Sequence, residues 1–205
     1  MLPSSEFFRQ QSLRLGVEKD LFTSDSWHGY DRLFVLDRAL FEDRLTPHTL
    51  AVVHPGFYTY FTYPDRDPPF DYLRYQDAMR ATVQEALDQN HCVLAWVSAN
   101  HRRGALDAMG VNPTDDRIML IPTIVGRASP AMDCARLGIG HPGIFWESMQ
   151  RKVHQLTLCG EYYMPEDGTG CVYGVLQEAV GYIPNVTVIN HATYNPRSNI
   201  QPIAR

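Results

Sequence analysis

Lysine is scarce in this chain of 205 residues. Lysine and arginine together number 18, and Lys19 and Lys152 are the only lysines. The arginines are scattered along the chain, and the formal net charge is −5. Proteins that bind nucleic acids present a concentrated basic surface to the phosphates. We therefore expect no nucleic-acid partner.

Long apolar runs are also missing. The longest ones are interrupted and have the length of a strand, whereas a membrane-spanning helix needs about 20 apolar residues. The first residues lack the positively charged stretch and apolar stretch of a secretory signal. These absences predict a protein with no membrane partner and a cytoplasmic location.

The cysteines are few and widely spaced. They are Cys92, Cys134, Cys159 and Cys171, without any C-x-x-C pair. Their spacing favours neither a disulfide framework nor a zinc site, and it fits free thiols in a reducing compartment. The histidines show no spacing typical of metal ligands. We expect no metal and no cofactor.

Short apolar segments alternate with helical patterns along the chain. The predicted strands are Thr49–Val53, Cys92–Val97, Ile118–Ile121, Gln155–Cys159 and Val186–Ile189. Such alternation is typical of βαβ units, which place parallel strands between two helical layers. The sequence therefore predicts an α/β fold: a Rossmann-like three-layer sandwich with a mainly parallel sheet of five or six strands.

The predicted organisation is an N-terminal arm (1–48) followed by one α/β domain (49–205). Within the domain, an amphipathic helix is expected from Asp71, as its N-cap, to Gln89, with Leu73 among the inward positions. Gly110 is expected to end a later, shorter helix. A polar tail is expected from Ala192 to the end of the chain.

Cys171 follows a polar, glycine-rich loop (Gly160–Gly170) and begins the next predicted helix. The free N–H groups and the dipole at a helix N-terminus stabilise negative charge, and the thiolate is the nucleophilic form of cysteine. In a parallel sheet, loops at the carboxyl ends of strands build the ligand crevice. Cys171 is therefore a candidate nucleophile. Alternatively, it is a small buried residue that packs the helix on the sheet.

Two further polar residues end predicted strands. His54 follows Thr49–Val53 and can act as the base for Cys171, and Glu161 follows the strand before the loop and can orient the imidazole or act as an acid. The N–H groups around Gly170 and Cys171 can form an oxyanion hole. Alternatively, His54 is hydrogen-bonded to a nearby carbonyl and Glu161 is only the polar start of a loop.

An aromatic loop, Phe57–Tyr63, leaves the same strand end as His54. Its side chains Phe57, Tyr58 and Tyr60 are candidates to bind a flat or ring-bearing small molecule, because ligand pockets are mostly apolar. The alternative is a packing or dimer contact, since aromatic residues are enriched at interfaces. We expect a homo-oligomer.

The C-terminal pattern combines a strand ending at Gly160, the pair Cys171-Val172, Gly181 and the strand Val186–Ile189. With the strand before His54, this pattern resembles the isochorismatase-like cysteine hydrolases, which include nicotinamidases and related amidases. The resemblance covers about residues 49–193. It implies the sandwich fold, a nucleophilic Cys171, and a substrate with a small amide or related C–N bond.

The chain departs from that family at three places. His54 stands where the family has an aspartate base. The family has a catalytic lysine near the end of the strand that corresponds to Ile118–Ile121, but no lysine lies between Lys19 and Lys152. The first cation after that strand is Arg127, which we assign to substrate binding. The loop between Gly160 and Cys171 is several residues longer than in that family. Two readings remain: a divergent cysteine hydrolase, or a non-catalytic module for binding or assembly.

Two other interpretations concern the same loop. Residues 166–170 before a helix can cradle an anion through backbone N–H groups, although their two acidic side chains oppose phosphate and no phosphate-binding motif is present. Residues 170–174 also match G-x-C-x-G, the form of a nucleophile elbow with cysteine. That elbow requires a strand directly before the nucleophile.

Overall fold

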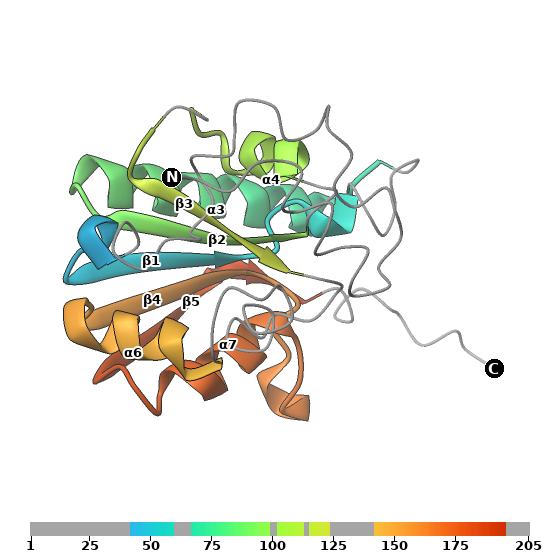
Figure 1. Cartoon of the computed structure of the whole chain (residues 1–205). Helices are drawn as coiled ribbons and strands as arrows, with labels where there is room; N and C mark the ends of the chain where they lie inside the picture. The colour runs from blue at the N-terminus through green and yellow to red at the C-terminus, as the bar shows by residue number, and fades with distance from the viewer. Residues whose placement is uncertain (1–41, 60–66, 99–101, 113–114, 124–141, 196–205) are drawn as a thin grey trace, which may run out of the picture.

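The computed structural model describes residues 42–59, 67–98, 102–112, 115–123 and 142–195. Their strands form one five-stranded sheet in the order β3-β2-β1-β4-β5, and every neighbouring pair is parallel. The strands are β1 (His48–Val53), β2 (Cys92–Ser98), β3 (Ile118–Thr123), β4 (Gln155–Glu161) and β5 (Asn185–Tyr194). The predicted parallel sheet is confirmed (Figure 1).

Helices cover both faces of the sheet (Figure 1). They are α3 (Phe70–Asp88), α4 (Arg102–Met109), α6 (Pro142–Lys152) and α7 (Cys171–Ala179), with a short 3₁₀ helix, η5 (Pro165–Asp167). α3 and α4 pack on one face and α6 and α7 on the other. This division follows from right-handed crossovers, because the chain moves outward from β1 to β3 and then continues on the other side of β1. The three-layer sandwich is confirmed.

The central strand β1 shows why its sequence is a continuous apolar run. Leu50 and Val52 pack against α3 and α4, whereas Ala51 and Val53 belong to the core under α6 and α7. A strand between two helical layers buries both sets of alternating side chains. We call the two cores the α3 face and the α7 face.

The strand order reverses between β1 and β4. Open α/β sheets bind ligands at such a switch point, outside the carboxyl ends of the strands. His54 directly follows β1, Glu161 ends β4, and Cys171 begins α7. The predicted position of His54 at the end of a central strand and that of Cys171 at a helix N-terminus are confirmed.

The sequence misassigned two features of α3. Its N-cap is Pro69, and Asp71 lies within the first turn. Leu73 is exposed, whereas Tyr72 and Tyr75 are buried. In the first turns of α3 the rings of Tyr72 and Tyr75 take the inward positions because they pack against Tyr194 on β5, a contact that the helical pattern alone does not reveal.

β5 is also longer than the predicted strand Val186–Ile189. The pairing register with β4 shifts between Leu158 and Gly160, so that Gly160 pairs with Thr193. Such an irregularity breaks the period of two in the side-chain pattern. The prediction of a polar tail from Ala192 is therefore wrong for Ala192–Tyr194, where Ala192 and Tyr194 are buried.

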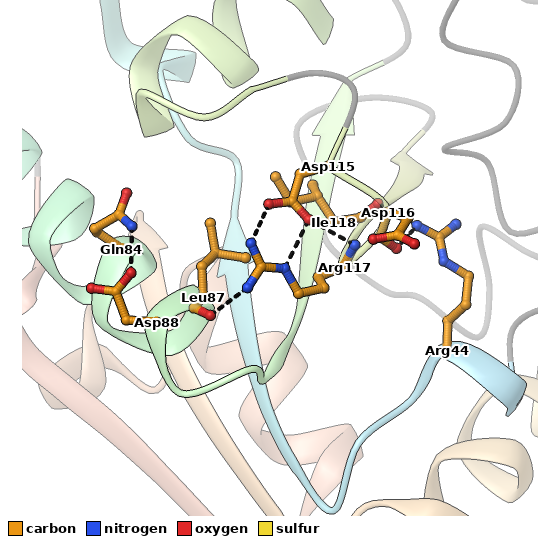
Figure 2. A network of polar contacts seen from close by, with 8 residues as sticks. All are labelled: Arg44, Gln84, Leu87, Asp88, Asp115, Asp116, Arg117 and Ile118. Atoms are coloured by element: carbon orange, nitrogen blue, oxygen red, sulfur yellow. Dashed lines mark hydrogen bonds and ion pairs between the residues drawn. The ribbon is translucent and has the colours of Figure 1, made fainter.

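Part of the predicted arm packs on the domain. Leu45 lies in the α7-face core, and the Arg44 guanidinium donates to the carbonyls of Asp116 and Ile118 at the start of β3. Next to it, Arg117 is held by the carboxylate of Asp115 (Figure 2). This polar network fixes the amino end of β3, whereas Cys171 lies at the carboxyl edge of the sheet. Residues 1–41 lie outside the described part of the chain.

Within the described ranges, the structure contains no helix with the length and apolar character that a membrane span requires.

The close approach of β1 and β4 gives a test of this fold. Gly160 has φ +125°, and a Cβ on it would lie 2.2 Å from the carbonyl oxygen of Val53. We expect Gly160→Ala to lower the free energy of unfolding by several kcal/mol, because strain and overpacking combine (about 2–5 kcal/mol). Chemical denaturation measures the loss.

The matched control is Gly181→Ala, where the nearest atom to a new Cβ is 3.6 Å away. That substitution is expected to change stability by less than about 1 kcal/mol. Equal stability of the two variants would contradict the described pairing of β1 with β4.

Candidate functional site

The segment after β1 forms a tight turn that buries His54. The backbone N–H of His54 donates to the carbonyl of Trp96 at 2.9 Å, and the carbonyl of His54 accepts from the N–H of Phe57 at 3.1 Å. His54 has φ +51° and Gly56 has φ +78°, a region that favours glycine and, among other residues, histidine and asparagine. The chain therefore folds back on itself immediately after the strand.

The His54 side chain is 1 % exposed, and its ring stacks on Phe57 with centroids 5.3 Å apart. Burial lowers its pKa from 6.5 to about 4, because the charged imidazolium is poorly solvated there. The ring is thus neutral at neutral pH. A neutral imidazole can accept a proton, as a general base requires.

The Glu161 side chain is fully buried, and donors surround its carboxyl group. Oε1 accepts from the N–H of Gly56 and from the hydroxyl of Tyr72, both at 2.8 Å, and Oε2 accepts from the N–H of Tyr58 at 2.6 Å. Burial raises the pKa of Glu161 to about 8, although the hydrogen bonds that it accepts oppose that rise.

Glu161 and Cys171 belong to opposite faces of the sheet. Glu161 binds Tyr72, which lies in the α3-face core, whereas Cys171 packs in the α7-face core. The partners that the structure gives Glu161 are the backbone of the loop after β1 and α3. Its expected role as the orienting group of the His54 imidazole stays a prediction.

Cys171 is the first residue of α7, and its side chain is 8 % exposed. The first helical hydrogen bond runs from the N–H of Gly174 to the carbonyl of Gly170, at 2.9 Å. No side chain caps this helix end, so the first amides and the helix dipole act on groups near the thiol.

Gly170 has φ +103°, and a Cβ there would lie 1.9 Å from the carbonyl oxygen of Tyr162. Only glycine fits that approach. The preceding chain forms an isolated bridge between Met164 and Thr169 that closes over η5. Because a turn and not a strand precedes Cys171, the nucleophile-elbow interpretation is wrong.

The aromatic loop divides its rings between two environments. Phe57 lies against His54 and Tyr162, whereas Tyr58 packs between Tyr72 and Tyr194, at centroid distances of 5.1 and 5.2 Å. Phe57 is therefore the better placed of the two to meet a ligand beside His54. The candidates Tyr60 and Arg127 lie outside the described residues.

Sequence reasoning missed Tyr72. Its hydroxyl is a donor to Glu161 and lies 3.4 Å from the hydroxyl of Thr59. The available signal was a tyrosine on the inner side of an amphipathic helix, since a buried tyrosine needs a partner for its hydroxyl. Nothing in the sequence indicates which residue supplies that partner.

In the described part of the chain, no three histidine, cysteine, aspartate or glutamate residues come together in a way that would hold a metal ion.

Comparisons with known proteins are sparse. No protein-family model and no curated protein match the chain. A solved structure that is similar is N-carbamoylsarcosine amidase from Thermoplasma acidophilum, with 11 % sequence identity, a TM-score of 0.49, and coverage of 77 % of this chain and 87 % of that chain. This likeness says nothing of activity.

The thiols offer a test of the site. Burial raises the pKa of Cys92 and of Cys159 to about 12, so almost none of either thiol is ionised at neutral pH. We expect iodoacetamide to alkylate Cys171 at pH 7.5 well before those two, because Cys171 opens a helix. Peptide mapping by mass spectrometry follows each site separately, and equally slow labelling of all three would favour a packing role.

The pH dependence of stability gives a second test. Unfolded His54 loses most of its remaining charge between pH 6.5 and 7.5, and above that range it is neutral in both the folded and unfolded states. Unfolded Glu161 ionises near 4.5, but folded Glu161 keeps its proton up to about 8. The folded state then binds the extra proton, so the free energy of unfolding falls as pH rises from 7 to 8, by at most about 1.4 kcal/mol per unit.

Urea denaturation across this range measures the slope. Glu161→Gln is the comparison, because glutamine cannot ionise. The variant is expected to be less stable, but with a flatter dependence on pH. An identical slope in both proteins would mean that Glu161 does not titrate in this way.

Proposed function

We propose that this protein is a cysteine hydrolase that cleaves a small amide or a related C–N bond, with Cys171 as nucleophile and His54 as base. The observation that carries the proposal is their shared location. Cys171 begins α7 and His54 directly follows β1, both at the carboxyl edge of the sheet where the strand order reverses. This edge is where open α/β folds hold their ligands.

In the proposed reaction, the neutral imidazole of His54 accepts the proton of the Cys171 thiol. The thiolate attacks the carbonyl carbon, and N–H groups at Gly170 and Cys171 stabilise the oxyanion. The C–N bond breaks as the imidazolium returns its proton to the leaving nitrogen. Water, deprotonated by the imidazole, then hydrolyses the thioester and releases the acid.

The low pKa of His54 bears on this scheme. An imidazole with a pKa of about 4 is almost wholly in the basic form at neutral pH, but it is a weaker base than an exposed histidine. It therefore acts by taking a proton and not as a positive charge beside a pre-formed thiolate. Phe57, stacked on this ring, supplies an apolar wall for a flat substrate.

A non-catalytic module of the same fold is the second candidate. The observation that favours it is the enclosure of Glu161, since this candidate catalytic carboxyl is fully buried and its oxygens are engaged by the loop and by Tyr72. Such a protein would bind a ligand or partner without turnover.

A panel of amides tests the two candidates, including nicotinamide-like and N-carbamoyl compounds. We expect Cys171→Ser and Cys171→Ala to lower turnover by at least about a thousandfold, because the nucleophile is lost. Circular dichroism is expected to stay unchanged. Release of ammonia or amine is the measurement.

Cys159→Ala is the matched control, since it removes another buried thiol, on the opposite face of the sheet. It should retain turnover per folded molecule. If no compound is hydrolysed and the Cys171 thiol is also unreactive, the hydrolase proposal fails and the non-catalytic module stands.

A further inference from the structure

Three donors converge at the carboxyl end of β1. They are the backbone N–H groups of Gly56 and Tyr58 and the hydroxyl of Tyr72. We call this set the carboxyl cradle. Successive backbone N–H groups that point into one concavity form a nest, a structure that binds anions in many proteins. The positive φ angles of His54 and Gly56 produce that inward turn.

The cradle lies where a parallel sheet of this order receives its ligands, beside the reversal point between β1 and β4. Its occupant is the side chain of Glu161, from the neighbouring strand. Glu161 and Gly56 are 105 residues apart in sequence. The carboxyl group therefore joins the end of β4 to the loop after β1 and, through Tyr72, to α3.

All three groups of the cradle donate hydrogen bonds in this arrangement. An amide of the same shape would turn its own NH₂ donors toward them, and an apolar side chain would leave buried N–H groups without acceptors. The cradle therefore fits the acceptor oxygens of a carboxylate, the form that Glu161 takes above a pKa of about 8, better than an amide or an apolar group.

We propose that the carboxyl cradle is an acid-binding site which the chain fills with its own Glu161, and that Glu161 and Tyr72 are positioning residues for the loop carrying His54 and Phe57. The acid-binding site is argued from the contacts alone, whereas the positioning role of Glu161 and Tyr72 rests on the proposed hydrolase function. Glu161 has no contact with the reacting atoms in this scheme. It fixes the loop that presents the base.

Acetate tests the cradle directly, because Glu161→Ala deletes the atoms of an acetate group. The variant is expected to lose on the order of 10 °C in Tm, since buried donors lose their acceptor. Sodium acetate should restore a large part of that loss. Acetamide, and sodium chloride at equal ionic strength, should restore little.

The matched control is Cys159→Ala, which also shortens a fully buried side chain of β4 on the α3 face. Its cavity is apolar, so acetate should not raise its Tm beyond the effect on the wild-type protein. Equal effects of acetate and acetamide on Glu161→Ala, or equal effects of acetate on both variants, would overturn the acid-binding site.

Tyr72→Phe provides a milder variant if Glu161→Ala does not fold. It removes one donor and keeps the ring. We expect hydrogen exchange at the amides of Gly56 and Tyr58 to accelerate by tenfold or more, with little change at Leu94 in β2. Unchanged protection of the two amides would overturn the proposal.

Turnover separates the cradle from the catalytic proposal. If acetate restores both Tm and amide hydrolysis in Glu161→Ala, and the recovery of hydrolysis is a rise in kcat, the positioning role is supported. If it restores Tm but even the wild-type protein hydrolyses nothing, the cradle stands and the hydrolase proposal fails. If the wild-type protein is active and acetate restores neither quantity, the cradle proposal fails alone.

Discussion

The burial of one carboxyl group shapes the carboxyl edge of this sheet. Glu161 is carried into the interior at the end of β4, where water cannot solvate it, and an unsatisfied buried carboxyl would cost several kcal/mol. The loop after β1 supplies two backbone N–H groups and α3 supplies a hydroxyl. The positive φ of His54 and Gly56 turns the loop toward that carboxyl.

Most of the fold was predictable because burial between two helical layers leaves a direct mark on sequence. β1, β2 and β3 are apolar runs whose alternate residues enter the two cores. Gly110 ends α4 with φ +67°, as a C-terminal glycine should, and Cys171 begins α7. These features depend on local patterns, so a single sequence is enough to find them.

The candidate site was predictable in its parts but not in its connections. The hydrogen bond between Glu161 and Gly56 joins residues far apart in the chain and uses a backbone donor. The residue type at position 56 therefore does not predict this bond. Tyr72 was missed because its role depends on meeting Glu161 and Tyr194. The extension of β5 was missed because the register shift opposite Gly160 breaks the alternation of side chains.

At this edge, the two faces of the sheet hold different parts of the candidate site. The α3 face holds the carboxyl cradle and the aromatic rings around Tyr58, whereas the α7 face holds Cys171. Of the three candidate catalytic residues, His54 lies in the turn between β1 and the cradle, so the cradle fixes the backbone that carries it.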